Sequence, residues 1–324
     1  MLMNSSKLLF LSFMIVGVMI SFSSNSWVMV WTGMELFLLS FIPFFCNFSF
    51  LSSECAMSYF LIQGVSSSLF GFCMIFMLVT DYEFLKSFLC FSLLLKLGCA
   101  PFHSWIFGVV SGMSFNSLMI FLTFSSLPPF FLLSHISFNL NFFVLLNLVV
   151  GSVGGLNQCS LKKILGFSSI FNLGFLIYLL NLTSLWLIYF IFYLFMVSFV
   201  LMFLYLYCIE YLNHLFVSGL SMFSKISFWI LFLSLGGMPP MFGFFVKLIC
   251  IEYSIYNFDY FISFFMVIFS LVVIFFYIRC SFVSLFMGSY LLKWNIYLSF
   301  FFFNFFCLIS SFIFPFCFVV KGLI

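Results

Sequence analysis

The chain has 324 residues, of which 66% are hydrophobic and only 5% are charged, and its net charge at pH 7 is +3. An ordinary soluble domain carries roughly 25% charged residues, so this chain cannot cover itself with a hydrated surface. The composition, with a mean hydropathy of +1.36, excludes soluble proteins and predicts an all-α polytopic membrane protein.

Apolar runs of about 20 residues, the length that crosses a bilayer, divide the chain into about eleven predicted transmembrane segments. The links between them are mostly short, and none is rich enough in Pro, Gly or charge to separate a second folded domain. We therefore predict one transmembrane domain over residues 1–324. The predicted segments are 7–22, 26–47, 55–80, 87–109, 114–136, 140–157, 161–181, 183–208, 225–256, 259–282 and 296–319.

The distribution of Lys and Arg predicts the orientation of the chain. An odd number of segments places the termini on opposite sides, and the side richer in Lys and Arg is the side of synthesis. Only Lys86 and Lys321 fall on the far side. Six residues fall on the side of the N-terminus, which we therefore expect to face the compartment of synthesis: Lys7, Lys162, Lys163, Lys225, Arg279 and Lys293.

Three charged residues fall well inside predicted segments, away from the segment ends. Glu35 and Lys96 lie near the middle of two segments, and Lys247 lies within a third. A charge at the centre of a membrane helix costs roughly 2.5–3.5 kcal/mol on insertion scales, and folding does not require that cost. The placement predicts an ion or proton pathway, and the alternative is a structural ion pair that joins two helices.

Proline and glycine interrupt three of the predicted segments. Pro101 follows Lys96 and lacks a backbone N–H, Pro128 and Pro129 lie in the fifth segment, and Gly-Gly-Met-Pro-Pro at 236–240 interrupts the ninth. Irregular backbone at membrane depth is tolerated only where protein or a water-filled cavity satisfies it. Broken helices in both halves of a chain are typical of the inverted repeats of transporters, and the alternative for each break is an ordinary proline kink.

No cofactor or metal site is predicted on this chain. The eleven Cys include no Cys-x-x-Cys pair, so the spacing of iron–sulfur and zinc sites is absent. The three histidines, His103, His135 and His214, fall on separate segments, which argues against a bis-histidine haem. No glycine-rich phosphate-binding motif occurs. The N-terminus has neither a cleavable signal nor an import presequence, which indicates a chain inserted where it is made.

Five motifs occur in order between about residues 20 and 260. They are Trp-Thr-Gly-Met-Glu at 31–35, Tyr-Phe-Leu-Ile-Gln at 59–63, Leu-Lys-Leu-Gly-Cys-Ala-Pro-Phe-His-Ser-Trp at 95–105, the run 154–169 that begins Gly-Gly-Leu-Asn-Gln, and the run 234–247 that contains Leu-Gly-Gly-Met-Pro-Pro. Together they resemble the chain 2 family of mitochondrial respiratory complex I (NADH:ubiquinone oxidoreductase), an antiporter-like family. The first motif falls in the second segment, which is similar to the animal form.

The resemblance implies roles for four of these residues. Glu35 resembles a glutamate that pairs with the lysine of the first broken helix, here Lys96. Without a partner a desolvated ammonium releases its proton, whereas a nearby carboxylate makes the ammonium retain it. Lys247 matches the terminal lysine of the second broken helix, which passes protons toward the exit. His103 is either a contact of the relay or a structural residue that hydrogen-bonds freed backbone.

The chain departs from the family pattern in the fifth segment. The family carries a lysine there, and this chain has Ser126 at that position. A hydroxyl can hydrogen-bond water but cannot carry a proton as a lysine does. Either a hydrated path through Ser125 and Ser126 connects Lys96 to Lys247, or the pumping of this subunit is impaired.

The resemblance implies a core membrane subunit of complex I that takes part in proton translocation across the mitochondrial inner membrane. NADH, FMN, iron–sulfur clusters and ubiquinone would lie elsewhere in the assembly, with no redox chemistry on this chain. Other core and accessory subunits, cardiolipin and other lipids are the expected partners, and nucleic acid is not. The alternatives are a free-standing cation/proton secondary transporter and a spacer that holds the assembly together without moving protons.

Overall fold

The computed structural model of the protein describes residues 5–46, 49–79, 83–136, 138–217, 222–239 and 241–286. Within these ranges every regular element is a helix, and the one extended pairing is an isolated bridge between Ser160 and Tyr211. The predicted all-α fold is confirmed. The chain divides into two compact units, Met1–Phe143 with Leu180–Thr183 and Val144–Leu179 with Ser184–Ile324. The single domain expected over 1–324 stays a prediction.

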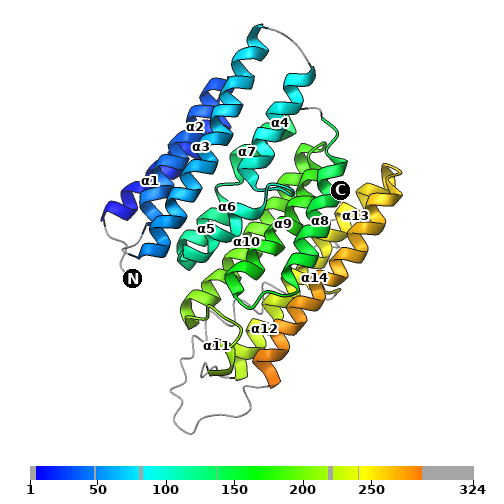
Figure 1. Cartoon of the computed structure of the whole chain (residues 1–324). Helices are drawn as coiled ribbons and strands as arrows, with labels where there is room; N and C mark the ends of the chain where they lie inside the picture. The colour runs from blue at the N-terminus through cyan, green and yellow to red at the C-terminus, as the bar shows by residue number, and fades with distance from the viewer. Residues whose placement is uncertain are drawn as a thin grey trace. The chain divides into compact units, whose positions relative to one another are not determined.

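In the first unit, α1, α2 and α3 pack side by side (Figure 1). Two glycines bring α1 and α2 together, because a Cβ on Gly17 or Gly33 would lie within 2.8 Å of the carbonyl oxygen of the other. Small residues at such crossings let membrane helices approach closely. This unit contains α1 (Ser5–Ser23), α2 (Trp27–Phe45), α3 (Phe50–Val79), α4 (Glu83–Leu97), α5 (Ser104–Gly112), α6 (Phe115–Thr123) and α7 (Leu127–Ser134).

In the second unit, α9 is buried at every residue from Ile164 to Leu179. Gly151 of α8 lies against its backbone, where an added Cβ would be 2.5 Å from the nitrogen of Phe171. The neighbours α12 and α14 pack against each other in the same unit (Figure 1). The unit holds most of α8 (Asn141–Gly155), α9 (Leu161–Leu179), α10 (Thr183–Tyr207), α11 (His214–Val217), α12 (Met222–Gly236), α13 (Phe242–Tyr256) and α14 (Tyr260–Phe286).

The predicted number of eleven transmembrane segments is not confirmed. Three predicted segments, 87–109, 114–136 and 225–256, are each divided into two helices, and 296–319 lies outside the described residues. Two shorter apolar helices, Asn141–Gly155 and Phe223–Gly236, are also present. Seven stretches of the described residues are long and apolar enough to span a membrane: Ser5–Ser23, Trp27–Phe45, Phe50–Met77, Phe115–Ser134, Leu161–Leu179, Ser184–Tyr207 and Tyr260–Phe282.

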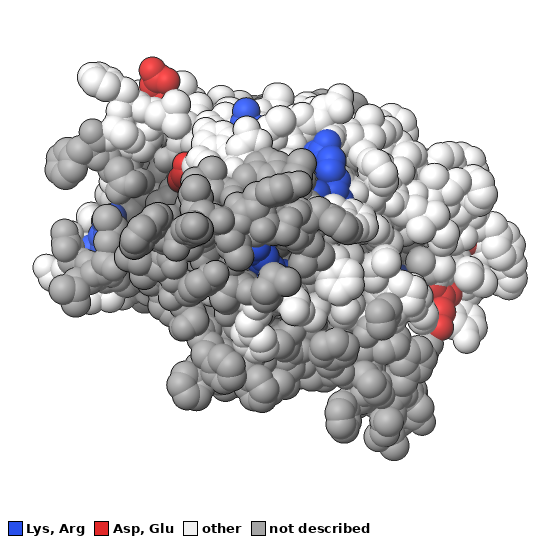
Figure 2. Space-filling view, turned by 90° about the horizontal axis from the view of Figure 1, so that it is seen from below, with Lys and Arg blue, Asp and Glu red and all other residues white. Residues whose placement is uncertain are grey.

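The outer surface is apolar, as a lipid-facing surface requires. Large side chains such as Met19, Ile75 and Phe261 are more than 60% exposed. Among the described residues on the face that Figure 2 shows, the charged side chains are a few isolated patches between uncharged ones. This surface fits lipid or a protein neighbour and does not fit water.

Candidate functional site

The first predicted helix break is present, and a glycine ends its first half. Gly98 has φ +68, its N–H donates to the carbonyl of Leu95 at 3.1 Å, and the N–H of Cys99 donates to Leu94 at 3.0 Å. This is a Schellman motif, which closes a helix with a left-handed residue. Helix α4 therefore ends at Leu97 and is closed by Gly98, three residues before Pro101. Helix α5 begins at Ser104.

Lys96 lies in the last turn of α4 and meets Glu35 of α2. Its Nζ is 3.5 Å from Oε1 of Glu35, within an ion pair whose side chains are 4% and 27% exposed respectively. The two charges that the sequence places in separate segments are therefore in contact. Removing Glu35 would leave the Lys96 ammonium buried without compensation, a loss that costs about 3–5 kcal/mol in a fully buried pair and less here, because the Glu35 side chain is 27% exposed.

Gln63 is a polar neighbour of this ion pair. The sequence motif alone did not predict its contact with Lys96. Its Nε2 donates to the main-chain carbonyl of Lys96 at 3.1 Å, and the residue is 7% exposed on α3. The last carbonyls of a helix lack partners within the helix, so this amide satisfies one of them. The only sequence signal was its place at the end of the Tyr-Phe-Leu-Ile-Gln motif.

A small cavity of about 20 Å³ lies next to Lys96. Its polar lining comes from Tyr59, Gln63, Lys96 and Ser125, and its apolar lining includes Pro128. This volume is enough for one water molecule, and the polar groups around it could hold one. The first unit therefore contains a part-buried ion pair beside a space that water can occupy.

The two serines of the fifth segment differ in their surroundings. Ser125 lines the cavity beside Lys96, and Ser126 does not. The Ser125 hydroxyl donates to the carbonyl of Phe121, and the Ser126 hydroxyl donates to the carbonyl of Thr123 at 2.9 Å. The structure thus places Ser125 beside Lys96. The role of Ser126 in a proton path stays a prediction.

His103 lies in the turn that joins α4 to α5. Its Nδ1 is 3.1 Å from the carbonyl oxygen of Pro101, to which it donates, and its ring packs edge-on against Phe107. It is not among the residues that line the cavity beside Lys96. These contacts favour the structural alternative for this histidine, which holds the irregular turn after the break.

The second break is built in the same way as the first. Gly237 has φ +83, its N–H donates to the carbonyl of Ser234 at 3.1 Å, and the N–H of Met238 donates to Leu233 at 3.2 Å. The next helix, α13, starts directly against this end, because a Cβ on Gly243 would lie 1.8 Å from the carbonyl oxygen of Ser234. The break predicted from the Gly-Gly-Met-Pro-Pro run is therefore present, although Pro240 lies outside the described residues.

Lys247 of α13 is 5% exposed and reaches back to this break. Its Nζ donates to the carbonyls of Leu235, at 3.4 Å, and Gly236, and it lies 5.3 Å from the ring centre of Phe171. Within the part of the chain that the structure describes, no carboxylate lies within 4 Å of this ammonium. The carbonyl end of α12 and an aromatic face therefore stabilise the charge, which suits the negative end of a helix dipole.

A second cavity, of about 30 Å³, lies beside Lys247. Tyr189, Tyr193 and Asn172 contribute to its lining, and the Tyr189 hydroxyl donates to Oδ1 of Asn172 at 3.0 Å. This volume also exceeds the space that one water needs. Lys96 and Lys247 thus each line a small cavity that neutral polar groups also line.

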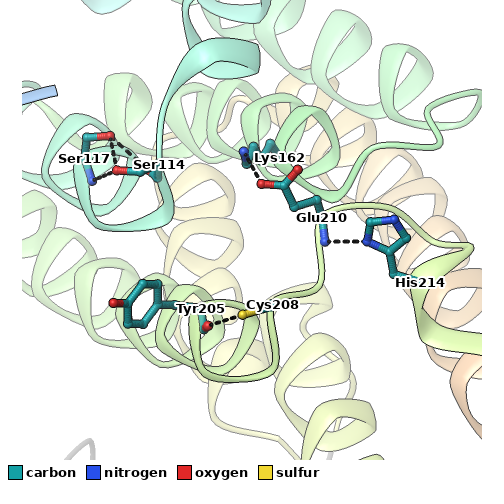
Figure 3. Close-up of polar contacts among 7 residues, drawn as sticks. All are labelled: Ser114, Ser117, Lys162, Tyr205, Cys208, Glu210 and His214. Carbon is teal, nitrogen blue, oxygen red and sulfur yellow. Dashed lines mark hydrogen bonds and ion pairs between the residues drawn. The ribbon is translucent and has the colours of Figure 1, made fainter. Parts of the chain in front are cut away.

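Basic residues of the second unit organise the loops around α9. Lys162 pairs with Glu210 at 2.9 Å, and the Glu210 N–H donates to Nδ1 of His214 at 3.4 Å (Figure 3). The Arg279 guanidinium donates to the carbonyls of Leu156 and Gln158, the latter at 3.0 Å. The sequence analysis used Arg279 only to predict the orientation of the chain. In the structure, Arg279 binds the main chain of the Gly-Gly-Leu-Asn-Gln motif at the end of α8.

Residues 24–276 match the family described as NADH:quinone oxidoreductase/Mrp antiporter, transmembrane. The NADH-ubiquinone oxidoreductase chain 2 of Anopheles gambiae is 37% identical over 299 residues, which cover 88% of this chain and 87% of that protein. Respiratory complex I from Thermus thermophilus with bound aureothin contains a similar chain. It has a TM-score of 0.81 and 19% identity, and the match covers 95% of this chain and 76% of that one.

The Mrp complex from Dietzia sp. also contains a similar chain, with a TM-score of 0.71 and 15% identity, covering 86% of this chain and 60% of that one. At such identities the two solved structures show a shared fold alone. The sequence match is closer and spans most of both proteins. The chain therefore belongs to the NADH:quinone oxidoreductase/Mrp antiporter transmembrane family and, within it, to the NADH-ubiquinone oxidoreductase chain 2 proteins.

Proposed function

We propose that this chain is a core membrane subunit of respiratory complex I in the mitochondrial inner membrane and that it takes part in proton translocation. The observation that carries the proposal is the ion pair of the buried Lys96 with the part-buried Glu35 at a helix break, in a chain of the chain 2 family. A charge within a membrane-spanning helix is costly and marks a functional site by default. A pair that can open and close offers a site where a proton is held and released.

In this proposal Lys96 and Lys247 hold protons by different means. Lys96 retains its proton while Glu35 is within reach, and it releases the proton when the pair opens. Lys247 is stabilised by backbone carbonyls and an aromatic ring, so no carboxylate has to move to load it. Conformational changes driven by electron transfer elsewhere in the assembly would open the first pair, and Lys247 would pass protons toward the exit.

The neutral groups beside Lys96 support a hydrated path in place of the missing lysine. Ser125 and Tyr59 line a cavity that can hold a water next to the ammonium. A water held there could accept the proton that Lys96 releases. We infer that Ser125 takes the nearer part in such a path, with Ser126 and His103 as lesser candidates.

We further propose that NADH, FMN, the iron–sulfur clusters and ubiquinone are bound by other subunits, so that no redox step occurs on this chain. Other core and accessory subunits, cardiolipin and other lipids would cover the apolar outer surface. The N-terminus would face the matrix, because Lys162, Lys163 and Arg279 belong to the side that the charge count assigns to it.

A free-standing cation/proton transporter is not favoured. The fold is common to complex I and the Mrp complex, so the fold does not separate the two functions. The 37% identity to a complex I chain over most of its length favours a subunit of complex I. A spacer without proton transport would share this identity, and only a functional measurement separates it from a relay.

Membership in the complex is tested by native electrophoresis of gently solubilised mitochondrial membranes, with NADH-oxidation staining and mass spectrometry of the active band. We expect this chain in the large NADH-active band. Its presence only in a small inactive band would reject membership and favour the free-standing transporter.

Proton transport is tested with Lys96→Ala in the assembled complex. The ratio of protons pumped to electrons transferred is expected to fall while NADH oxidation continues. The matched control is Lys163→Ala, which removes a lysine at the head of α9, and this variant should keep the ratio. An unchanged ratio in Lys96→Ala, with normal assembly, would leave the spacer as the better description.

A further inference from the structure

The two helix breaks present an equivalent main-chain carbonyl to a side-chain donor. In each break this carbonyl belongs to the residue two positions before the left-handed glycine, Lys96 before Gly98 and Leu235 before Gly237. Both carbonyls lie in the last turn of a helix closed by a Schellman motif, where intrahelical partners run out. A buried side chain supplies the missing hydrogen bond in both places.

The donors at the two carbonyls differ in charge. At the second break the donor is the Lys247 ammonium, 3.4 Å from the carbonyl oxygen of Leu235. At the first break the donor is the neutral amide of Gln63, 3.1 Å from the carbonyl oxygen of Lys96. The residue that owns the first carbonyl is itself the lysine of its break, and its ammonium meets Glu35. A neutral donor satisfies the backbone without competing for that carboxylate.

Three helices meet at this arrangement in the first unit. Gln63 comes from α3, which packs against both α4 and α2, and Glu35 comes from α2. The Gln63 side chain lines the same cavity as Lys96 and Ser125. Its amide therefore ties the backbone of the last turn of α4 to a helix that does not carry the carboxylate.

We propose that Gln63 is a positioning residue for the Lys96–Glu35 pair. Its amide holds the end of α4 in the register at which the Lys96 ammonium reaches Glu35, so that the pair closes reproducibly after each opening. The inference rests on the proposed function, because it gives the pair a part in proton transport. The simpler alternative is that Gln63 only satisfies a buried carbonyl, which would affect the stability of the fold and not the pair.

The experiment uses the assembled complex with Gln63→Met, which keeps the length of the side chain and removes its donor. Gln63→Ala is the second variant, because it leaves room for a water at the carbonyl. Ser67→Ala is the matched control, since Ser67 is also buried on α3 and donates only to Gly64 of its own helix. Each is measured alone and combined with Glu35→Gln, for assembly, NADH oxidation and protons pumped per electron.

We expect Gln63→Met to assemble, to oxidise NADH as before and to lower the pumping ratio to the level of Glu35→Gln. Combined with Glu35→Gln it should cause no further loss, because both changes disable one pair. Ser67→Ala should keep the ratio. Separate and additive losses would overturn the proposal, since a structural defect does not depend on the partner of Lys96.

The remaining outcomes separate the inference from the function on which it rests. If Lys96→Ala lowers the ratio and neither Gln63 variant does, the positioning role is wrong and the relay stands. If Lys96→Ala leaves the ratio unchanged, the proposed function fails first. If neither Gln63 variant assembles, Gln63 is required for folding, and the proposal is overturned.

Discussion

Replacing Gly237 with alanine should damage the second helix break in two ways. The residue has φ +83, a conformation that costs a residue with a Cβ about 1–2 kcal/mol. The added Cβ would also lie 2.9 Å from Cδ and 3.1 Å from Nζ of Lys247. The end of the Lys247 side chain would therefore have to shift, and we expect it to lose a hydrogen bond to the carbonyl of Leu235 or of Gly236.

The size of the effect follows from these two contributions. A hydrogen bond from a charged donor contributes about 1.5–3 kcal/mol. Added to the backbone strain, its loss gives an expected destabilisation of about 2.5–5 kcal/mol for Gly237→Ala. Since Lys247 would shift within its site, the pumping ratio should fall even in the fraction of complexes that assemble.

The assay is the temperature at which the complex loses this chain on native electrophoresis, together with protons pumped per electron. Gly64→Ala is the control, because Gly64 lies inside α3 with no atom within 4 Å of an added Cβ. That change should be neutral or should stabilise the helix by about 0.5–1 kcal/mol. Equal behaviour of the two variants, in stability and in pumping, would refute the reasoning about Gly237.

Three further changes test other parts of the structure. Gly33→Ala should weaken the crossing of α1 and α2 by about 1–3 kcal/mol, because its Cβ would lie 2.7 Å from the Gly17 carbonyl oxygen; the assembled fraction measures this, and normal assembly would contradict it. Arg279→Lys should lower the temperature of chain loss, since an ammonium cannot reproduce the two-pronged contact with the loop after α8; an unchanged temperature would argue against an anchoring role. Ser125→Ala should lower the pumping ratio more than Ser126→Ala, because only Ser125 lines the cavity beside the buried pair; the reverse order would restore Ser126 as the better candidate.

Much of the architecture followed from the residues in order. Composition determined the class, because a chain with 5% charged residues has no means of covering itself with a hydrated surface. Ten of the eleven predicted segments fall on helices that the structure describes, and the breaks near Pro101 and after Gly236 are present. These features depend on local polarity and on backbone chemistry, which neighbouring residues in the sequence specify.

The number of helices was harder to predict, because an apolar run does not show where a helix ends inside it. In the segment 114–136 the chain leaves the helix at 124–126, and Pro128 and Pro129 then lie in the first turn of α7, where a missing N–H costs little. At the first break the prediction rested on Pro101, whereas in the structure Gly98 is the residue that ends the helix. The signal for Gly98 was present, since a glycine directly after a helical run is the usual left-handed cap.

The sequence by itself determined that Glu35, Lys96 and Lys247 are charges within apolar runs, and that each requires a partner. Only the tertiary structure decided which partner each one has. Lys96 meets a carboxylate from another helix, and Lys247 meets backbone carbonyls and the ring of Phe171. The tertiary structure also places the Gln63 side chain at the carbonyl of Lys96, 33 positions away in the sequence. Such contacts depend on helix register and crossing, which arise from packing between distant segments and not from any local pattern.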